Sequence, residues 1–210
     1  MPTRHAAYLA LAGVLGLLAG VVGVQVMLAG APPPAGSGAK DNEEVARLFR
    51  EDQSDRAPAL AGKEIDWSVV GPRDQAREAR VKELYRADAL QTGADYFHAA
   101  MVLQHAQAAD DQLLAHEFCI VAAGRGEPRA LWLAAASEDR FLMNIGRPQR
   151  FATQYRAEDM TSPLRLYKVD PAVTDGLRQA FHAPSLAEAM AKEKAMNEKV
   201  GRKSQAGNAK

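Results

Sequence analysis

An uncharged apolar segment near the beginning of the chain constrains its folding most. Between Ala6 and Ala31 there is no charged residue, and Gln25 is the one strongly polar side chain. A helix of this length, at about 1.5 Å per residue, spans the hydrocarbon core of a bilayer. We therefore predict a transmembrane helix over residues 6–31, with Arg4 on the cytoplasmic side by the positive-inside rule.

A cleaved signal peptide is the alternative interpretation of this segment. Signal peptidases need small residues before the cleaved bond, and the triplet Ala29-Gly30-Ala31 provides them, but Pro32 follows at once. A proline directly after the bond blocks cleavage, which favours an uncleaved anchor. We expect a protein of the bacterial inner membrane whose C-terminal domain is extracytoplasmic, with secretion after signal cleavage as the alternative.

Composition divides the remainder of the chain into a linker, a domain and a tail. Residues 32–40 are rich in proline and glycine and predict a linker, and residues 41–190 predict one helical domain. Residues 191–210 contain six Lys and Arg against two Glu, which predicts a basic, partly disordered tail. The whole chain has 26 basic and 26 acidic residues, so its charge gives no reason to expect nucleic-acid binding.

The helical domain is predicted to be all-α, with about six to seven helices and one long irregular loop. Alanine is abundant and aromatic residues make up 6% of the chain, which favours closely packed helices over a sheet. Apolar spacing predicts helices from Asp41, over 72–93, from Ala94, over 110–123, from Glu127, over 173–181 and from Ser185. Residues 65–70 are predicted as an extended connector, and residues 144–155 as the irregular loop.

Capping residues and alanines give two further expectations. Asp41 with Glu44, and Ser185 with Glu188, have the spacing of capping boxes at helix starts. The helices predicted over 110–123 and from Glu127 should form an antiparallel hairpin, because small side chains let two backbones approach closely. The alanines that would line this hairpin are Ala115, Ala122, Ala123, Ala130, Ala134 and Ala135.

Three of the predicted helices share an unusual feature: the apolar stripe of each ends in polar residues. Helical spacing places these side chains one turn beyond the apolar positions, and so on the inward face. They are Asp52, Gln53 and Arg56 in the first helix, Gln104 and His105 in the third, and Asp139 and Arg140 in the fifth.

The order of these motifs resembles a known bacterial family. Asp52-Gln53-x-x-Arg56, Gln104-His105-Ala106, Asp139-Arg140 and the Gln149-to-Gln154 segment are similar to the domain of unknown function numbered 6624. The resemblance covers roughly residues 44–189 and implies a shared helical domain, but it implies no activity. The family pattern has glycine where this chain has Ala152, which argues against a positive-φ turn at this point.

We expect these polar helix ends to meet the predicted loop in one polar centre, because burying charges without partners costs several kcal/mol. The planar guanidinium of arginine can form two parallel hydrogen bonds to a carboxylate or phosphate, and the glutamine side chain can hydrogen-bond to amides and hydroxyls. We therefore predict a site for an anionic or amide-bearing ligand, with an envelope peptide, glycan or protein as the partner. The predicted ligand-binding residues are Asp52, Gln53, Arg56, Gln104, His105, Asp139, Arg140, Gln149, Thr153 and Gln154.

Two other functions stay open at this point. His105 with Asp139 could serve an envelope hydrolase, with Arg56 and Arg140 holding an anionic group. Alternatively, the domain could be a helical module that binds another protein, with structural roles for its polar residues. A helix-end arginine can stabilise the helix macrodipole, and Asp52 with Arg56 is an ordinary i,i+4 pair.

No cofactor or metal is predicted. The chain has no His-Glu-x-x-His motif and no glycine-rich phosphate-binding loop after a strand, and Cys119 is its one cysteine. A single cysteine excludes an internal disulfide framework and any cysteine-rich metal site. Cys119 lies in an apolar run, which is typical of a buried, unreactive thiol.

Overall fold

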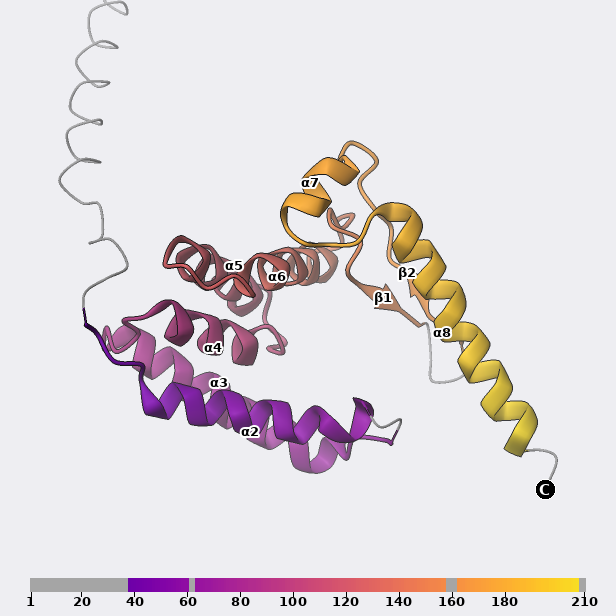
Figure 1. Ribbon diagram of the computed structural model, residues 1–210. Coiled ribbons are helices and arrows are strands. Elements are labelled where there is room, and N and C mark those ends of the chain that lie inside the picture. The colour runs from indigo at the N-terminus through magenta and orange to yellow at the C-terminus, as the bar shows by residue number, and fades with distance from the viewer. Residues whose placement is uncertain (1–37, 61–62, 158–161, 208–210) are drawn as a thin grey trace, which may run out of the picture. The chain divides into compact units, whose positions relative to one another are not determined.

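The described part of the computed structural model is mostly helical, with one small two-stranded sheet. The structure describes residues 38–60, 63–157 and 162–207. The elements shown in Figure 1 are α2 (Glu43–Leu60), α3 (Trp67–Arg86), α4 (Gly93–Leu103), α5 (Ala109–Gly124), α6 (Ala130–Asn144), β1 (Tyr155–Arg156), β2 (Arg165–Leu166), α7 (Asp175–Ala180) and α8 (Leu186–Gly207). The predicted mainly helical fold with a long loop is confirmed, and the loop contains a short hairpin.

The predicted transmembrane segment lies outside these residues. Residues 6–31, and most of the linker predicted over 32–40, precede residue 38, where the description begins. None of the helices in the described ranges combines the length and the apolar character that crossing a membrane requires. The membrane anchor stays a prediction.

Helix α4 lies at the centre of the domain. It packs against α2 and α3 on one side and against α5 on the other, and α6 pairs with α5 (Figure 1). The core contains Val45, Val81, Leu103 and Leu133, which are almost completely inaccessible to solvent. This arrangement brings the C-terminal end of α4, where Gln104 and His105 lie, between the ends of α2 and α6.

The alanine hairpin is confirmed. Ala115, Ala122, Ala130 and Ala134 are fully buried where α5 and α6 pack together. Helix α4 also approaches α5 closely, since a Cβ atom placed on Gly93 would lie 3.2 Å from the carbonyl oxygen of Ala122. Small residues therefore set the separation of these three helices, as their abundance in the sequence indicates.

Two predicted helix starts are wrong. Asn42, rather than Asp41, caps α2, because its side-chain oxygen accepts hydrogen bonds from the backbone N–H groups that begin the helix. Helix α3 begins at Trp67, so residues 67–70 are helical and not an extended connector. Asp66 caps this start by accepting from the backbone N–H of Ser68, a local signal that outweighs the β-branched Val69 and Val70.

Between α6 and α7 the chain forms the loop predicted from residue 144, but with internal structure. β1 and β2 pair antiparallel, and Gln149 forms an isolated bridge with Val169. Helix α8 begins with the predicted capping box of Ser185 and Glu188. It runs without a break to Gly207, across the domain boundary predicted at residue 190.

Candidate functional site

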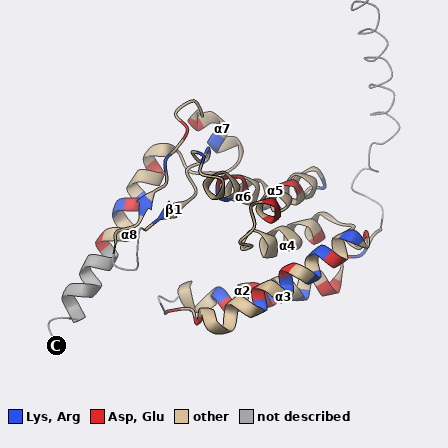
Figure 2. Cartoon of the chain, turned by 180° about the vertical axis from the view of Figure 1, so that it is seen from behind, with Lys and Arg blue, Asp and Glu red and all other residues tan. Residues whose placement is uncertain are grey.

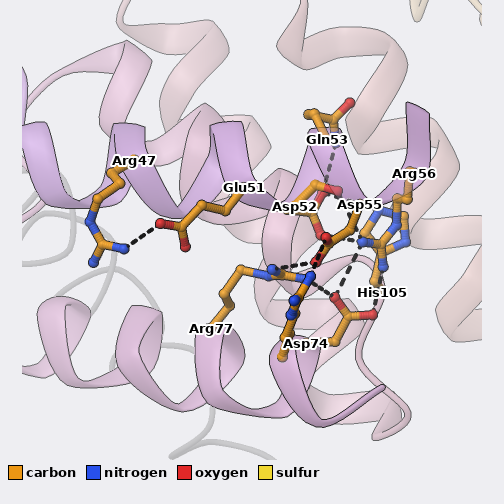
Figure 3. Close-up of polar contacts among 10 residues, drawn as sticks. Arg47, Glu51, Asp52, Gln53, Asp55, Arg56, Asp74, Arg77 and His105 are labelled. Atoms are coloured by element: carbon orange, nitrogen blue, oxygen red, sulfur yellow. Dashed lines mark hydrogen bonds and ion pairs between the residues drawn. The ribbon is translucent and has the colours of Figure 1, made fainter. Parts of the chain in front are cut away.

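A network of charged side chains joins α2 to α3. Arg56 contacts the Asp52 carboxylate at 2.7 Å and forms two hydrogen bonds to Asp74, at 2.8 and 3.2 Å (Figure 3). Arg77, whose side chain is 5% exposed, bonds to Asp74 and to Asp55. Charged residues of both signs follow α2 and α3 along their length (Figure 2). Asp52, Arg56 and their α3 partners therefore balance one another inside the fold.

His105 lies beside this network. Its Nε2 atom is 3.7 Å from Asp52 Oδ2, too far for a hydrogen bond, and it has no other hydrogen-bond partner among the described residues. Burial raises the pKa of Asp52 to about 6. Burial, together with the Arg56 and Arg140 charges, lowers the pKa of His105 to about 3. The imidazole is therefore neutral at physiological pH.

A cavity of about 460 Å³ opens where the C-terminal ends of α4 and α6 meet the loop after α6. Its lining residues are Gln104, His105, Ala106, Gln107, Gln112, Arg140, Met143, Asn144, Gln154 and Arg156. This lining combines two arginines, a histidine and five amide side chains, and it contains no carboxylate among the described residues. The cavity is thus electropositive and rich in hydrogen-bonding groups.

Arg140 is the unusual member of this lining. It is largely buried, which lowers the pKa of its guanidinium to about 10 and leaves it charged at neutral pH. Its one hydrogen bond in the described structure goes to the carbonyl oxygen of Ala136, at 3.3 Å, and no described carboxylate lies within 4 Å of it. Nearby, the buried Oε1 atom of Gln104 also has no partner. Gln104 Oε1 thus lacks the partner that burial ordinarily requires, and Arg140 faces the cavity without a counter-ion among the described residues.

Asp139, next to Arg140 in sequence, is hydrogen-bonded to the loop that follows α6. Its fully buried carboxylate accepts hydrogen bonds from the backbone N–H groups of Arg150, Phe151 and Thr153, and from the Thr153 hydroxyl. These four donors occupy both carboxylate oxygens. Asp139 therefore forms no ion pair with Arg140, although its charge raises the pKa of that guanidinium, and the carboxylate near His105 is that of Asp52 and not that of Asp139.

Gln149 has a similar structural position. Its buried side chain donates to the carbonyl oxygens of Gln154 and Tyr167 and accepts from the backbone N–H of Gln154. The Thr153 hydroxyl accepts from the side-chain amide of Gln154. Asp139, Gln149 and Thr153 thus shape the loop, and the loop places Gln154 against the cavity.

Ala152 adopts the conformation that its residue type argued against. Its φ is +57°, in the left-handed region that favours glycine, and it is fully buried. The hydrogen bonds of Asp139 to the residues on both sides of Ala152 hold the backbone there. Tertiary contacts therefore override the local preference of alanine at this turn.

The predicted site residues divide into three groups. Gln104, His105, Arg140 and Gln154 line the cavity; Asp52 and Arg56 belong to the α2–α3 network, and Gln53 donates a hydrogen bond to Asp52. Asp139, Gln149 and Thr153 hold the loop and do not line the cavity. The structure thus brings Asp52, His105, Arg140 and Gln154 to one region from four separate segments.

Several residues of this region were missed from the sequence. Asp74 and Arg77 follow Val70 and precede Val81 and Leu84 on one helical face, so the interrupted apolar stripe of α3 was a usable signal. Gln107, Asn144 and Arg156 line the cavity without any comparable pattern. Gln107 lies in the connection between α4 and α5, Asn144 is the last residue of α6 and Arg156 is in β1, so local spacing does not bring them together.

The described residues hold no obvious metal site. They contain no group of three or more His, Cys, Asp and Glu side chains placed to hold an ion. His98 stacks on Phe49 with ring centroids 4.5 Å apart, and the ring of His116 contacts the Ala134 carbonyl oxygen. Cys119 is fully buried, and burial raises the pKa of its thiol well above the usual range, so it is not a reactive nucleophile.

Comparison with known proteins adds no relative. No protein-family model matches the chain, and neither the curated proteins nor the solved structures contain a match. The resemblance to the domain of unknown function 6624 stays a prediction from the motifs.

Proposed function

We propose that the protein binds a small anionic ligand in the cavity at the ends of α4 and α6. The observation that carries this proposal is Arg140, a largely buried guanidinium with no carboxylate partner in the described structure. A buried arginine without a counter-ion is costly, and a bound carboxylate or phosphate would supply the missing charge through a two-pronged hydrogen bond.

The ligand should also carry a hydrogen-bond donor. The Oε1 atom of Gln104 is buried in the cavity wall without a donor, and a ligand hydroxyl or amide N–H would satisfy it. The other amides of the lining, on Gln107, Gln112, Asn144 and Gln154, suit the same chemistry. An anionic glycan or peptide fragment combines both kinds of group.

Binding is favoured over hydrolysis by the state of His105. A general base works best with a pKa near the working pH, whereas burial holds the pKa of His105 at about 3. Asp139, the partner considered for catalysis, is saturated by the loop N–H groups. A neutral imidazole beside Arg140 instead offers one more hydrogen-bonding group for a ligand.

We further propose that this site works outside the cytoplasm, with residues 6–31 as a bacterial inner-membrane anchor. The support is the uncharged stretch itself, with Arg4 before it and Pro32 at its end. Fragments of envelope peptides and glycans carry the carboxylates and hydroxyls that the cavity suits. Alkaline extraction of membranes tests the location: an anchored chain stays in the pellet, and a cleaved chain is released.

The sharpest test of binding compares two sugars that differ by one carboxylate. N-acetylmuramate has a lactyl carboxylate that N-acetylglucosamine lacks, and both carry an amide and hydroxyls. We expect N-acetylmuramate to raise the midpoint of thermal unfolding of the full-length protein, with about 1.4 kcal/mol of stabilisation at ten times the Kd. N-acetylglucosamine should give no comparable shift, and inorganic phosphate extends the test to other anions.

Arg140→Met is the matching variant. We expect it to abolish the response to the anions and to stabilise the unliganded protein by about 1–2 kcal/mol, because it removes an uncompensated buried charge. Arg147→Met, which changes an exposed arginine outside the cavity lining, is the control. If Arg140→Met instead destabilises the protein, and no anion shifts the parent, then Arg140 is a structural residue and the proposal is wrong.

A further inference from the structure

A second basic cavity adjoins the Arg140 cavity. It has a volume of about 560 Å³ and lies against the β1–β2 hairpin, lined in part by Arg156, Arg165, Tyr167 and Lys168. Arg156 belongs to the lining of both cavities, so the two spaces meet at its side chain. No carboxylate belongs to either lining among the residues that the structure describes.

The pairing of the hairpin places two arginines directly opposite each other. Arg156 in β1 is the cross-strand partner of Arg165 in β2, and directly opposed like charges destabilise a sheet. Arg165 is neutralised by Glu193 of α8, at 3.1 Å. Arg156 has no carboxylate within 4 Å in the described part of the chain, although it lies beside Arg165 and near Lys168.

We propose that the ligand is elongated and carries two anionic groups, one bound by Arg140 and the other by Arg156. This inference rests on the proposed function, because Arg140 receives the first anion. The charge distribution supports it, since neither arginine has a carboxylate within 4 Å among the described residues, and Arg156 belongs to the lining of both cavities. If the ligand carried one anionic group, bound by Arg140, the two positive charges of Arg156 and Arg165 would be balanced by the single carboxylate of Glu193.

Dicarboxylates and their half-amides provide the test. Succinate, adipate and suberate differ in length, and the half-amide of each replaces one carboxylate by a neutral group of the same shape. Affinities are measured by calorimetry on the full-length protein at constant ionic strength. We expect the dicarboxylate of matching length to bind at least about tenfold more tightly than its half-amide, as expected for one charge-assisted hydrogen-bonded pair of 1.5 kcal/mol or more.

Arg156→Gln should bring this ratio of affinities to about one, whereas Arg147→Gln, outside both linings, should leave the ratio as in the parent. Equal binding of dicarboxylate and half-amide by the parent, or a ratio that survives Arg156→Gln, overturns the second anion. In that case loss of all binding in Arg140→Met would still uphold the proposed function. If the parent binds none of the dicarboxylates or half-amides but responds to N-acetylmuramate, the second anion is wrong and the proposed function stands; if it responds to neither, both proposals fail.

Discussion

At the scale of single residues, neighbouring polar side chains have different roles. Asp139 and Arg140 are adjacent in α6, yet the first is saturated by loop N–H groups and the second has no carboxylate within 4 Å in the described part of the chain. Their side chains point to different surroundings because successive positions on a helix are separated by about 100°. The pair motif in the sequence therefore combines a structural residue with a candidate binding residue.

Asp139 should be a main support of the loop. We expect Asp139→Asn to lower the free energy of unfolding by about 3 kcal/mol, because it weakens charge-assisted hydrogen bonds and turns an amide NH₂ toward backbone donors. Urea unfolding measures this loss, and hydrogen exchange should quicken at the amides of Phe151 and Thr153. Asp110→Asn, which changes an exposed carboxylate, is the control. A loss below about 1 kcal/mol would contradict the role of Asp139.

His105 should govern how stability responds to acid. Its pKa is about 3 in the folded protein and near 6.5 in the unfolded chain, so only the unfolded chain gains this proton as the pH falls below 6.5. The folded state then loses about 1.4 kcal/mol per pH unit from this group. Asp52, with a pKa raised to about 6, acts oppositely between pH 6 and its unfolded value of 3.8.

His105→Gln isolates this contribution. Relative to the parent, we expect the variant to gain about 2 kcal/mol of stability between pH 7 and pH 5, since the unfolded state no longer takes up the imidazole proton. The measurement is urea unfolding at both pH values, with the exposed His182→Asn as a control for loss of an imidazole. A difference from the parent that does not change with pH would show that His105 titrates normally.

At the scale of elements, α2 and α3 are held together by ion pairs as well as by apolar contacts. Asp74 is the centre of this contact, since it accepts from both Arg56 and Arg77 while largely buried. Removing one partner of a buried network leaves the remaining charges uncompensated, whereas an exposed pair contributes little. The burial of an ion pair, rather than its presence, decides how much its loss changes the free energy of unfolding.

Asp74→Asn should therefore destabilise the protein by about 3 kcal/mol. Glu83→Gln in the same helix is a matched control, because the Glu83 side chain is 59% exposed where it pairs with Arg80. We expect the control to change stability by less than about 0.5 kcal/mol in urea unfolding. Equal losses in the two variants would show that burial does not distinguish these pairs.

The prediction of elements from the sequence was most successful where the helical pattern was long. Helix α5 runs over Ala109–Gly124, close to the predicted range 110–123, and the capping box of Ser185 and Glu188 begins α8. The start of α3 was missed because residues 65–70 alternate like a strand, although Asp66 caps a helix there. The hairpin of β1 and β2 has two residues per strand, too few for any periodic signal.

At the scale of the whole domain, the helices α4 to α6 and the C-terminal elements differ in burial. Helix α4 and the α5–α6 hairpin are rich in fully buried residues, whereas Ala189 is the one buried residue among the described side chains of α8. Helix α8 is attached to the hairpin by side chains such as Glu193 and Asn197. Elements with little buried apolar surface open at lower free energy.

Hydrogen exchange should follow this division. We expect amides of α5 and α6 to exchange only through global unfolding, and amides of α8 beyond Ala189 to exchange at least about tenfold faster through local opening. The measurement is native-state exchange on the full-length protein across low urea concentrations. Uniform protection from α4 to α8 would show that the domain opens as a single cooperative unit.

The amino-acid sequence by itself determined the helices and the polar residues at the ends of their apolar stripes, because periodicity and caps depend on neighbours within one or two turns. Only the tertiary structure decided which of those polar residues meet. Asp52 lies with the α3 charges, Asp139 holds the loop, and Arg140 is left facing a cavity. The reason is physical: a charge is neutralised by whichever group lies within a few ångströms in space, and Arg56 and Asp74, 18 positions apart in the chain, come that close only after folding.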